Sequence, residues 1–191
     1  MRREFVNIIG VKCKMIYFTS DFHFGHDREF IYGPRGYSNI YEEAEDLIKK
    51  FNSVITWEDT VYILGDCMLN NDEFGLKCLL RLNGFKYIIV GNHDTISRVM
   101  KYQDSGIFMS VDYGGRLHYN GWTYLFSHYP QITENYQDRH KVISLCGHSH
   151  TKDPFLHWDN GLIYHVEVDA HNGYPVSIDQ IESDIRKKLN I

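Results

Sequence analysis

Short apolar runs recur along the chain, and polar residues or glycine bound each of them. The runs are four to seven residues long and rich in Ile, Val, Tyr and Phe, which is typical of buried strands. We therefore expect strands at residues 15–19, 60–64, 87–90, 108–113, 123–126, 142–145 and 162–168.

Apolar positions spaced three and four residues apart predict helices between the early strands. The clearest case is 41–55, and similar patterns cover 72–82, with Asp72 placed to be the N-cap, and 178–189. Strand and helix alternate in the first half of the chain, and the second half is mostly strand. This order predicts an α/β protein with two mixed sheets packed face to face and helices outside.

Composition narrows the class of protein. No repeat, linker or shift in composition divides the chain, so we expect one domain over 1–191, with a leader at 1–14 and a core at 15–191. The net charge of -5, from 20 Lys+Arg and 25 Asp+Glu, argues against a sequence-independent grip on nucleic acid.

Membrane-spanning segments, cysteine motifs and signal peptides are the sequence features that indicate localisation. Its apolar runs are far shorter than the roughly 18 residues of a membrane-spanning helix, so we expect no membrane partner. None of its 4 cysteines stands in a C-x-x-C spacing, and no small-residue cleavage site follows the basic, then apolar, start of the chain. We therefore expect a reduced, cytoplasmic protein.

Side chains that can bind metal follow five of the predicted strands, at the point where each strand ends. The segments are Ser20-Asp21-Phe22-His23, Gly65-Asp66, Gly91-Asn92-His93-Asp94, Ser127-His128 and Gly147-His148-Ser149-His150. Ligands of open α/β sheets bind beyond the carboxyl ends of the strands, so these segments should meet. Residues two apart in extended chain point to the same side, which lets each D-x-H or H-x-H pair aim at one centre.

The candidate ligands suggest two ions. Seven residues are candidates: Asp21, His23, Asp66, Asn92, His128, His148 and His150. An ordinary zinc site takes only three or four protein ligands. Seven fit two ions roughly 3.5–4 Å apart that share a carboxylate, the arrangement that clamps a phosphoryl group. A nitrogen and oxygen set without thiolate suits Mn, Fe, Zn, Ni or Co better than Mg.

The ordered blocks D-x-H, G-D, G-N-H-D, H and G-H-x-H resemble those of the calcineurin-like metallophosphoesterases, from about Ile16 to Ser177. The resemblance implies a four-layer αββα sandwich and two divalent transition-metal ions, with Mn2+ the first expectation. It implies hydrolysis of phosphate esters by a metal-bridging hydroxide. It also implies that Asp66 bridges the ions, one held further by Asp21, His23 and His150 and the other by Asn92, His128 and His148.

The same resemblance implies roles beside the metals. His93 would not bind metal but would stabilise the transition state or protonate the leaving oxygen, with Asp94 orienting its ring. The segments at 22–26 and 127–130 look like a small bacterial or phage-type subgroup, in which His26 and Arg28 would meet the substrate. We interpret Arg35 as a surface or phosphate-steering residue.

We expect phosphodiester substrates of small, nucleotide-like kind, because the chain has no insertion long enough for a capping domain. Two alternatives stay open: a catalytically inactive scaffold of the same fold for protein interaction, and a nuclease, which would need a basic groove with stacking aromatics. A metallo-β-lactamase-like hydrolase is disfavoured because its H-x-H-x-D-H run is absent.

Overall fold

The structure is a computed structural model, and it describes residues 15–131, 141–158 and 161–191. The predicted leader, residues 1–14, lies outside these ranges.

The first sheet has five strands in the order β4-β3-β2-β1-β9. Four of them are parallel and consecutive in the chain: β1 (Ile16–Thr19), β2 (Thr60–Ile63), β3 (Phe85–Ile89) and β4 (Phe108–Asp112). The short β9 (Val176–Ser177) pairs antiparallel with β1. Parallel neighbours need crossover connections, and helices supply them: α2 (Ile40–Val54), α3 (Asp72–Leu80) and α4 (Ile96–Asp104).

The second sheet has four strands in the order β5-β6-β7-β8. β6 (Trp122–Phe126), β7 (Val142–Cys146) and β8 (Ile163–His165) run parallel, and β5 (Gly115–Tyr119) pairs antiparallel with β6. Asn120 and Gly121 join β5 to β6 with φ angles of 48° and 83°. Two positive φ angles belong to the tight hairpin turn that Asn-Gly favours.

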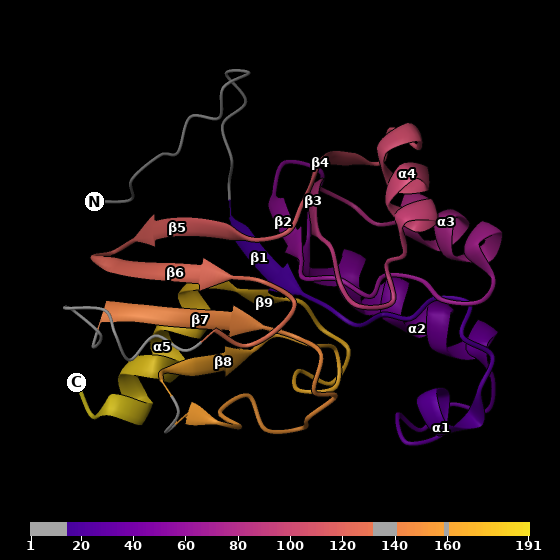
Figure 1. Ribbon diagram of the computed structural model, residues 1–191. Helices are drawn as coiled ribbons and strands as arrows, with labels where there is room; N and C mark the ends of the chain where they lie inside the picture. Colours follow the sequence, from indigo (N-terminus) through magenta and orange to yellow (C-terminus); the bar gives the residue numbers. More distant parts are fainter. Residues whose placement is uncertain (1–14, 132–140, 159–160) are drawn as a thin grey trace.

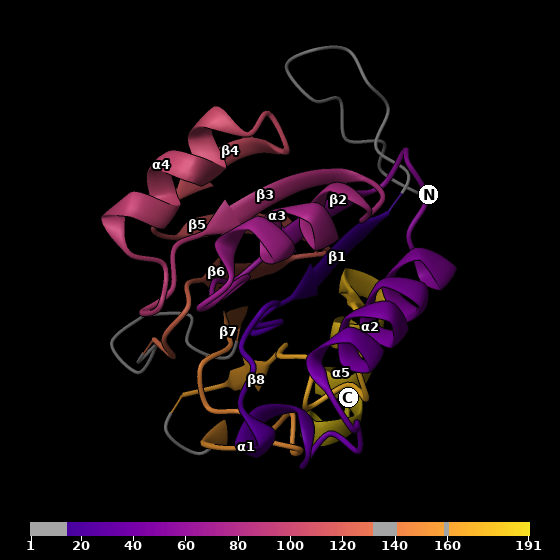
Figure 2. The ribbon, with the colours of Figure 1, turned by 90° about the vertical axis from the view of Figure 1, so that its right-hand side faces the viewer.

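Two hydrophobic clusters follow from the alternation of side chains along the strands. One lies between the first sheet and α2–α4 and includes Phe51, Ile63 and Ile88. The other joins the two sheets, where the Phe18 and Phe126 rings lie 5.5 Å apart, and it includes the inner side of α5 (Ile178–Leu189). Figure 1 shows β5–β8 on one side of β1–β3 and α2–α4 on the other. In Figure 2, which is seen from the helix side, α3 lies in front of these strands and α2 lies beside β1. The predicted α/β class, two mixed sheets flanked by helices, is confirmed.

The predicted elements are all present, with bounds that differ by a few residues, but four elements were not predicted. These are the single-turn α1 (Glu29–Tyr32), α4, β5 and β9. The predicted N-cap of α3 was wrong by one position: Asn71, not Asp72, accepts the backbone N–H of Phe74. Of the helices in the described ranges, none is long and apolar enough to cross a membrane.

The N-cap of α2 provides a test of the fold. The Asn39 side chain accepts the backbone N–H groups of Tyr41 and Glu42, both at 3.0 Å. Replacement by Ala leaves these two groups without a protein partner, so Asn39→Ala should lower the free energy of unfolding by about 1 kcal/mol in urea titrations. Asn39→Asp keeps the acceptor and should stay close to the wild type. An Ala variant as stable as the wild type would mean that the cap contributes nothing.

Candidate metal centre

The candidate ligands gather where the strands of both sheets end. The segments that follow β1, β2, β3, β6 and β7 carry them, and Figure 1 shows the arrowheads of β6 and β7 pointing toward the same region as that of β1. All seven candidates lie within the described ranges, and contacts between side chains link them into one group. The convergence predicted from the sequence is therefore present in the fold.

The backbone of this region adopts a conformation that residues other than glycine normally avoid. Five of the candidates have φ angles in the left-handed region: Asp21 at 60°, His23 at 52°, Asp66 at 53°, His148 at 75° and His150 at 49°. Each such residue costs about 1–2 kcal/mol relative to the right-handed conformation. Strain of this kind concentrates at functional sites, where the surrounding structure enforces it.

One group of ligand atoms comes from Asp21, His23 and His150, which lie close enough together to hold an ion. The Nε2 atoms of His23 and His150 are 3.1 Å apart, and each lies 3.8 Å from Oδ1 of Asp21. The Asp21 carboxylate is fully buried, and its Oδ2 accepts the backbone N–H of His148. Its Oδ1 has no hydrogen-bond partner, so this oxygen is available to a cation.

A second group contains Asp21, Asp66 and His128, and Asn92 and His148 adjoin it. Oδ2 of Asp66 lies 3.5 Å from Nε2 of His128 and 3.8 Å from Nε2 of His23, so this oxygen faces both groups. Oδ1 of Asn92 lies 2.7 Å from Nε2 of His128 and 2.8 Å from Nδ1 of His148.

The proton positions of two histidines suit metal binding. Nδ1 of His128 donates to the carbonyl oxygen of Leu64 at 2.8 Å, and Nδ1 of His150 donates to the Asp169 carboxylate at 2.9 Å. Because these acceptors carry no hydrogen, the protons sit on Nδ1, and in the neutral rings Nε2 presents a lone pair to the site. The donor set, the buried oxygen of Asp21 without a partner and the inward lone pairs together fit divalent cations.

Burial shapes the charges of the first group. It raises the pKa of the Asp21 carboxyl to about 6. Burial, with the neighbouring His150 and Arg35, lowers the pKa of His23 to about 2, which keeps that ring neutral at physiological pH. For His150 burial acts to lower the pKa, but the hydrogen bond with Asp169 and the charge of Asp21 outweigh it, and the pKa is raised.

The centre has a buried half and an open half. Asp21, His23, Asp66 and His128 are buried, whereas Asn92, His148 and His150 are exposed. His93 stands on the open side, with Nε2 4.0 Å from Oδ2 of Asp66 and 46% of its side chain exposed. A small molecule can therefore reach the candidate metal-binding atoms and His93 from solvent.

The structure corrects the predicted contact of Asp94. Its Oδ2 accepts the backbone N–H groups of Gly91 and Asp66, and its Oδ1 accepts the hydroxyl of Tyr102. These bonds hold the loops that carry the ligands, whereas no bond from Asp94 orients the His93 ring among the described residues. The His93 backbone is held elsewhere, by Oδ1 of Asp66 at its N–H and by Arg98 at its carbonyl oxygen.

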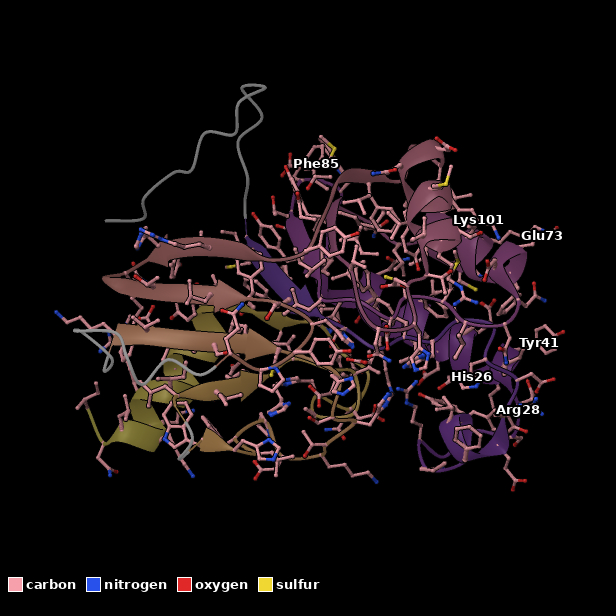
Figure 3. The ribbon with its side chains drawn as sticks, in the orientation of Figure 1. His26, Arg28, Tyr41, Glu73, Phe85 and Lys101 are labelled. Carbon is pink, nitrogen blue, oxygen red and sulfur yellow. The ribbon has the colours of Figure 1, made fainter. Side chains whose placement is uncertain are left out.

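His26 and Arg28 differ in their distance from the centre. The His26 ring lies 5.9 Å from the His23 ring, and burial together with His93 lowers its pKa. Arg28 is exposed, and in Figure 3 it lies further from the centre of the molecule than His26. The structure thus places His26 at the edge of the candidate metal centre, whereas Arg28 lies further out.

The interpretation of Arg35 as a surface residue was wrong. Its side chain is only 7% exposed, and it hydrogen-bonds the carboxylates of Glu43 and Asp169. Asp169, which in turn accepts a hydrogen bond from His150, was missed altogether. Its position after the predicted strand at 162–168 was the only signal in the sequence.

Proteins from an archaeon and a bacteriophage are similar to this chain over most of its length. The uncharacterized protein MJ1445 of Methanocaldococcus jannaschii is 31% identical over 183 residues, which cover 93% of this chain and 94% of that protein. The gene 66 protein of Mycobacterium phage L5 is 31% identical over 192 residues, which cover 86% of this chain and 91% of the phage protein. No model of a protein family matches the chain.

Among solved structures, a protein of unknown function from Aquifex aeolicus, AQ665, has the same fold. It superposes with a TM-score of 0.67 and 25% identity, over 88% of this chain and 98% of that one. A novel archaeal phosphodiesterase is a more remote match, with a TM-score of 0.46, 17% identity and coverage of 80% of this chain and 82% of that one.

Family membership follows from these findings taken with the site. The five motif blocks stand in order at the ends of strands from two mixed sheets, and the ligand atoms they carry converge. An archaeal and a phage protein are each 31% identical to this chain, and the matches cover more than nine tenths of both. The chain belongs to the calcineurin-like metallophosphoesterases.

Two glycines pack against the candidate ligand carboxylates, and replacing them tests whether this close packing is needed for metal binding. A Cβ at Gly147 would lie 2.3 Å from Oδ2 of Asp21, and a Cβ at Gly91 would lie 2.2 Å from Oδ1 of Asp66. Either alanine must displace a ligand carboxylate, so Gly147→Ala and Gly91→Ala should weaken Mn2+ binding at least about ten-fold in calorimetric titration.

Gly114→Ala is the control for these two variants, because a Cβ there meets nothing closer than 3.3 Å. It should bind Mn2+ like the wild type. Wild-type affinity in both Gly147→Ala and Gly91→Ala would contradict the geometry of the centre.

Proposed function

We propose that the protein is a phosphoesterase that uses two divalent transition-metal ions, Mn2+ first among them, to hydrolyse small phosphodiesters of nucleotide-like kind. The observation that carries the proposal is the pair of adjoining ligand groups, which share Asp21 and which both place a histidine beside Asp66. Oδ2 of Asp66 lies within 4 Å of Nε2 atoms that belong to different groups, those of His23 and His128.

In this proposal each ion has its own ligands and shares Asp66. Asp21, His23 and His150 complete one site, and Asn92, His128 and His148 complete the other. Bound ions would supply Lewis acidity toward the phosphoryl oxygens and a water-derived nucleophile near neutral pH. The buried half of the centre holds its carboxylates away from solvent, which strengthens their attraction for cations.

His93 is proposed as the general acid. Its ring lies beside Asp66 on the open face, and among the described residues Nε2 has no polar partner closer than the 4.0 Å contact with Asp66. A protonated ring there can donate from Nε2 to the oxygen that leaves the phosphorus. Arg98, tied to Asp72 at 2.8 Å, donates to the carbonyl oxygen of His93 and so restrains the residue.

Exposed aromatic rings flank the centre and support a nucleotide-like substrate. Tyr129, 51% exposed, packs its ring 4.6 Å from that of His148. Phe30, 68% exposed, meets His26 edge to face at 5.5 Å. Such rings offer stacking surfaces for a base. His26 would then contact the substrate, and the charge of Arg28, which lies further out, would attract the substrate phosphate as it approaches.

The open face and the absence of a capping segment among the described residues are compatible with the substrates of a nuclease, but the net charge of -5 favours a small ester. We also propose a cytoplasmic setting, which the three free, buried cysteines Cys67, Cys78 and Cys146 support.

The role of His93 can be separated from metal binding by mutation. His93→Ala should retain both ions and lose about 100-fold or more in turnover, because it removes a proton donor and no ligand. Asp66→Ala should lose metal as well. Bound metal is measured by elemental analysis and turnover with added Mn2+. His118→Ala, an exposed histidine on β5, is the control and should leave both unchanged.

Full activity of His93→Ala on every ester tried would contradict the acid assignment.

The substrate class is tested with bis(p-nitrophenyl) phosphate and p-nitrophenyl phosphate in the presence of Mn2+. The open centre should favour the diester, because its exposed side, at Asn92, His148 and His150, leaves room for a second ester group. A strong preference for the monoester would overturn the diester assignment. A protein that binds the ions but hydrolyses neither ester nor nucleic acid would favour the scaffold alternative.

A further inference from the structure

Arg35 makes more polar contacts than a structural arginine needs. Its Nε and Nη2 donate to the two oxygens of Asp169 at 2.9 and 2.8 Å, and its Nη1 donates to Glu43 at 2.8 Å. Nη2 and Nη1 also approach the carbonyl oxygens of Asp21 and Phe22, at 2.9 and 3.3 Å. One guanidinium therefore ties the segment after β1 to helix α2 and to the segment after β8.

The three charges of this cluster are almost fully withdrawn from water. The exposed fractions of the side chains are 7% for Arg35, 10% for Asp169 and 4% for Glu43. Burying a charged group costs several kcal/mol before its partners compensate, and an apolar cluster often stabilises a fold equally well. A buried triad of this kind is thus weak evidence for stability, and its contact with the metal centre calls for another explanation.

That contact runs through His150. Oδ2 of Asp169 accepts the Nδ1–H of His150 at 2.9 Å, which leaves Nε2 to face Asp21 and His23. Carboxylates that hold a ligand histidine in this way fix its tautomer and its ring orientation. The bidentate bond from Arg35 in turn holds the Asp169 carboxylate in one orientation.

We propose that Arg35, Asp169 and Glu43 form a positioning relay that presents His150 to one ion of the pair and sets the affinity for that ion. The inference rests on the proposed two-ion function. Asp169 acts on the His150 ring, Arg35 acts on Asp169 and on the carbonyl oxygen of Asp21, and Glu43 balances the guanidinium from α2.

The relay serves only one of the two ion positions. His148 lies two residues before His150, but its Nδ1 faces Asn92, and no carboxylate hydrogen-bonds its ring among the described residues. Nδ1 of His128 bonds a main-chain carbonyl oxygen. A substitution of Asp169 should therefore lower the affinity for the ion held by Asp21, His23 and His150 and leave the affinity for the other ion unchanged.

A cavity beside Arg35 and Asp169 gives small molecules access to the relay. Arg35 and Asp169 line a cavity of about 170 Å³ together with Tyr37, Lys50 and Asn172. A small planar cation can enter a space of that size, so the role of the guanidinium can be tested by chemical rescue of a truncated Arg35.

The test uses metal-stripped full-length protein titrated with Mn2+ alone in a calorimeter. Asp169→Asn and Arg35→Lys should weaken one of the two binding events about 10–100-fold and leave the other unchanged. In Arg35→Ala, millimolar guanidinium should restore much of the lost affinity. Thermal unfolding without metal reports whether each variant is folded, and Arg35→Lys and Asp169→Asn carry the test if Arg35→Ala is not.

Arg81→Lys is the matched control. Arg81 also donates to both oxygens of a carboxylate, that of Glu45, but its side chain is exposed, at the C-terminal end of α3. It should bind Mn2+ like the wild type. Nitrogen NMR of the histidine rings adds a readout that general destabilisation does not move: the preference of His150 for the Nδ1–H tautomer should be lost in Asp169→Leu, which has no acceptor for that hydrogen.

Unchanged affinities in Asp169→Asn and Arg35→Lys, or an equal weakening of both events, would overturn the relay while leaving the two-ion function intact. A wild-type protein that takes up no Mn2+ would overturn the proposed function and the relay together.

Discussion

The burial of two carboxylates at the ends of adjacent parallel strands is the constraint on which the rest of the structure depends. Asp21 and Asp66 are at most 2% exposed, and both lie in left-handed backbone that an ordinary residue avoids. Buried like charges repel, and burial raises the pKa of Asp21. Cations resolve that conflict, and the surrounding histidine nitrogens and the Asn92 oxygen are the groups that would hold them.

The fold supplies this constraint through its topology. Parallel strands β1, β2 and β3 deliver three loops to one edge, and β6 and β7 deliver two more from the sheet packed against them. Buried polar bonds then hold the loops: Asp94 bonds the backbone of Gly91 and Asp66, and Arg35 bonds the backbone of Asp21. The centre is therefore rigid on its buried side and open where a substrate must enter.

Much of this was predictable, because strands and ligands leave local signals. Apolar runs predicted seven of the nine strands in the described ranges, and the candidate ligands that follow five of them lie close together. The missed elements have weaker signals. β5 alternates half-buried and exposed residues, β9 has two residues, and α4 buries only Tyr102. For β5 the one local signal is the Asn120-Gly121 pair, which forms the hairpin turn to β6.

The contacts that support the centre could not be read from the sequence, because they join positions far apart in the chain. Arg35 and Asp169 are separated by 134 residues, and a lone arginine in a Gly-rich segment gives no sign of burial. The family resemblance implied that Asp94 orients the His93 ring, but the turn directs the carboxylate to the backbone of Gly91 instead. Tertiary geometry alone decides such pairings.

The central claim is that side chains from both sheets hold two neighbouring cations. The most direct measurement is the anomalous diffraction of a crystal of the protein grown with Mn2+. Two peaks roughly 3.5–4 Å apart are expected, with the Asp66 carboxylate between them. A single peak, or a map in which Asp21, Asp66 and the histidines surround no metal, would contradict the claim.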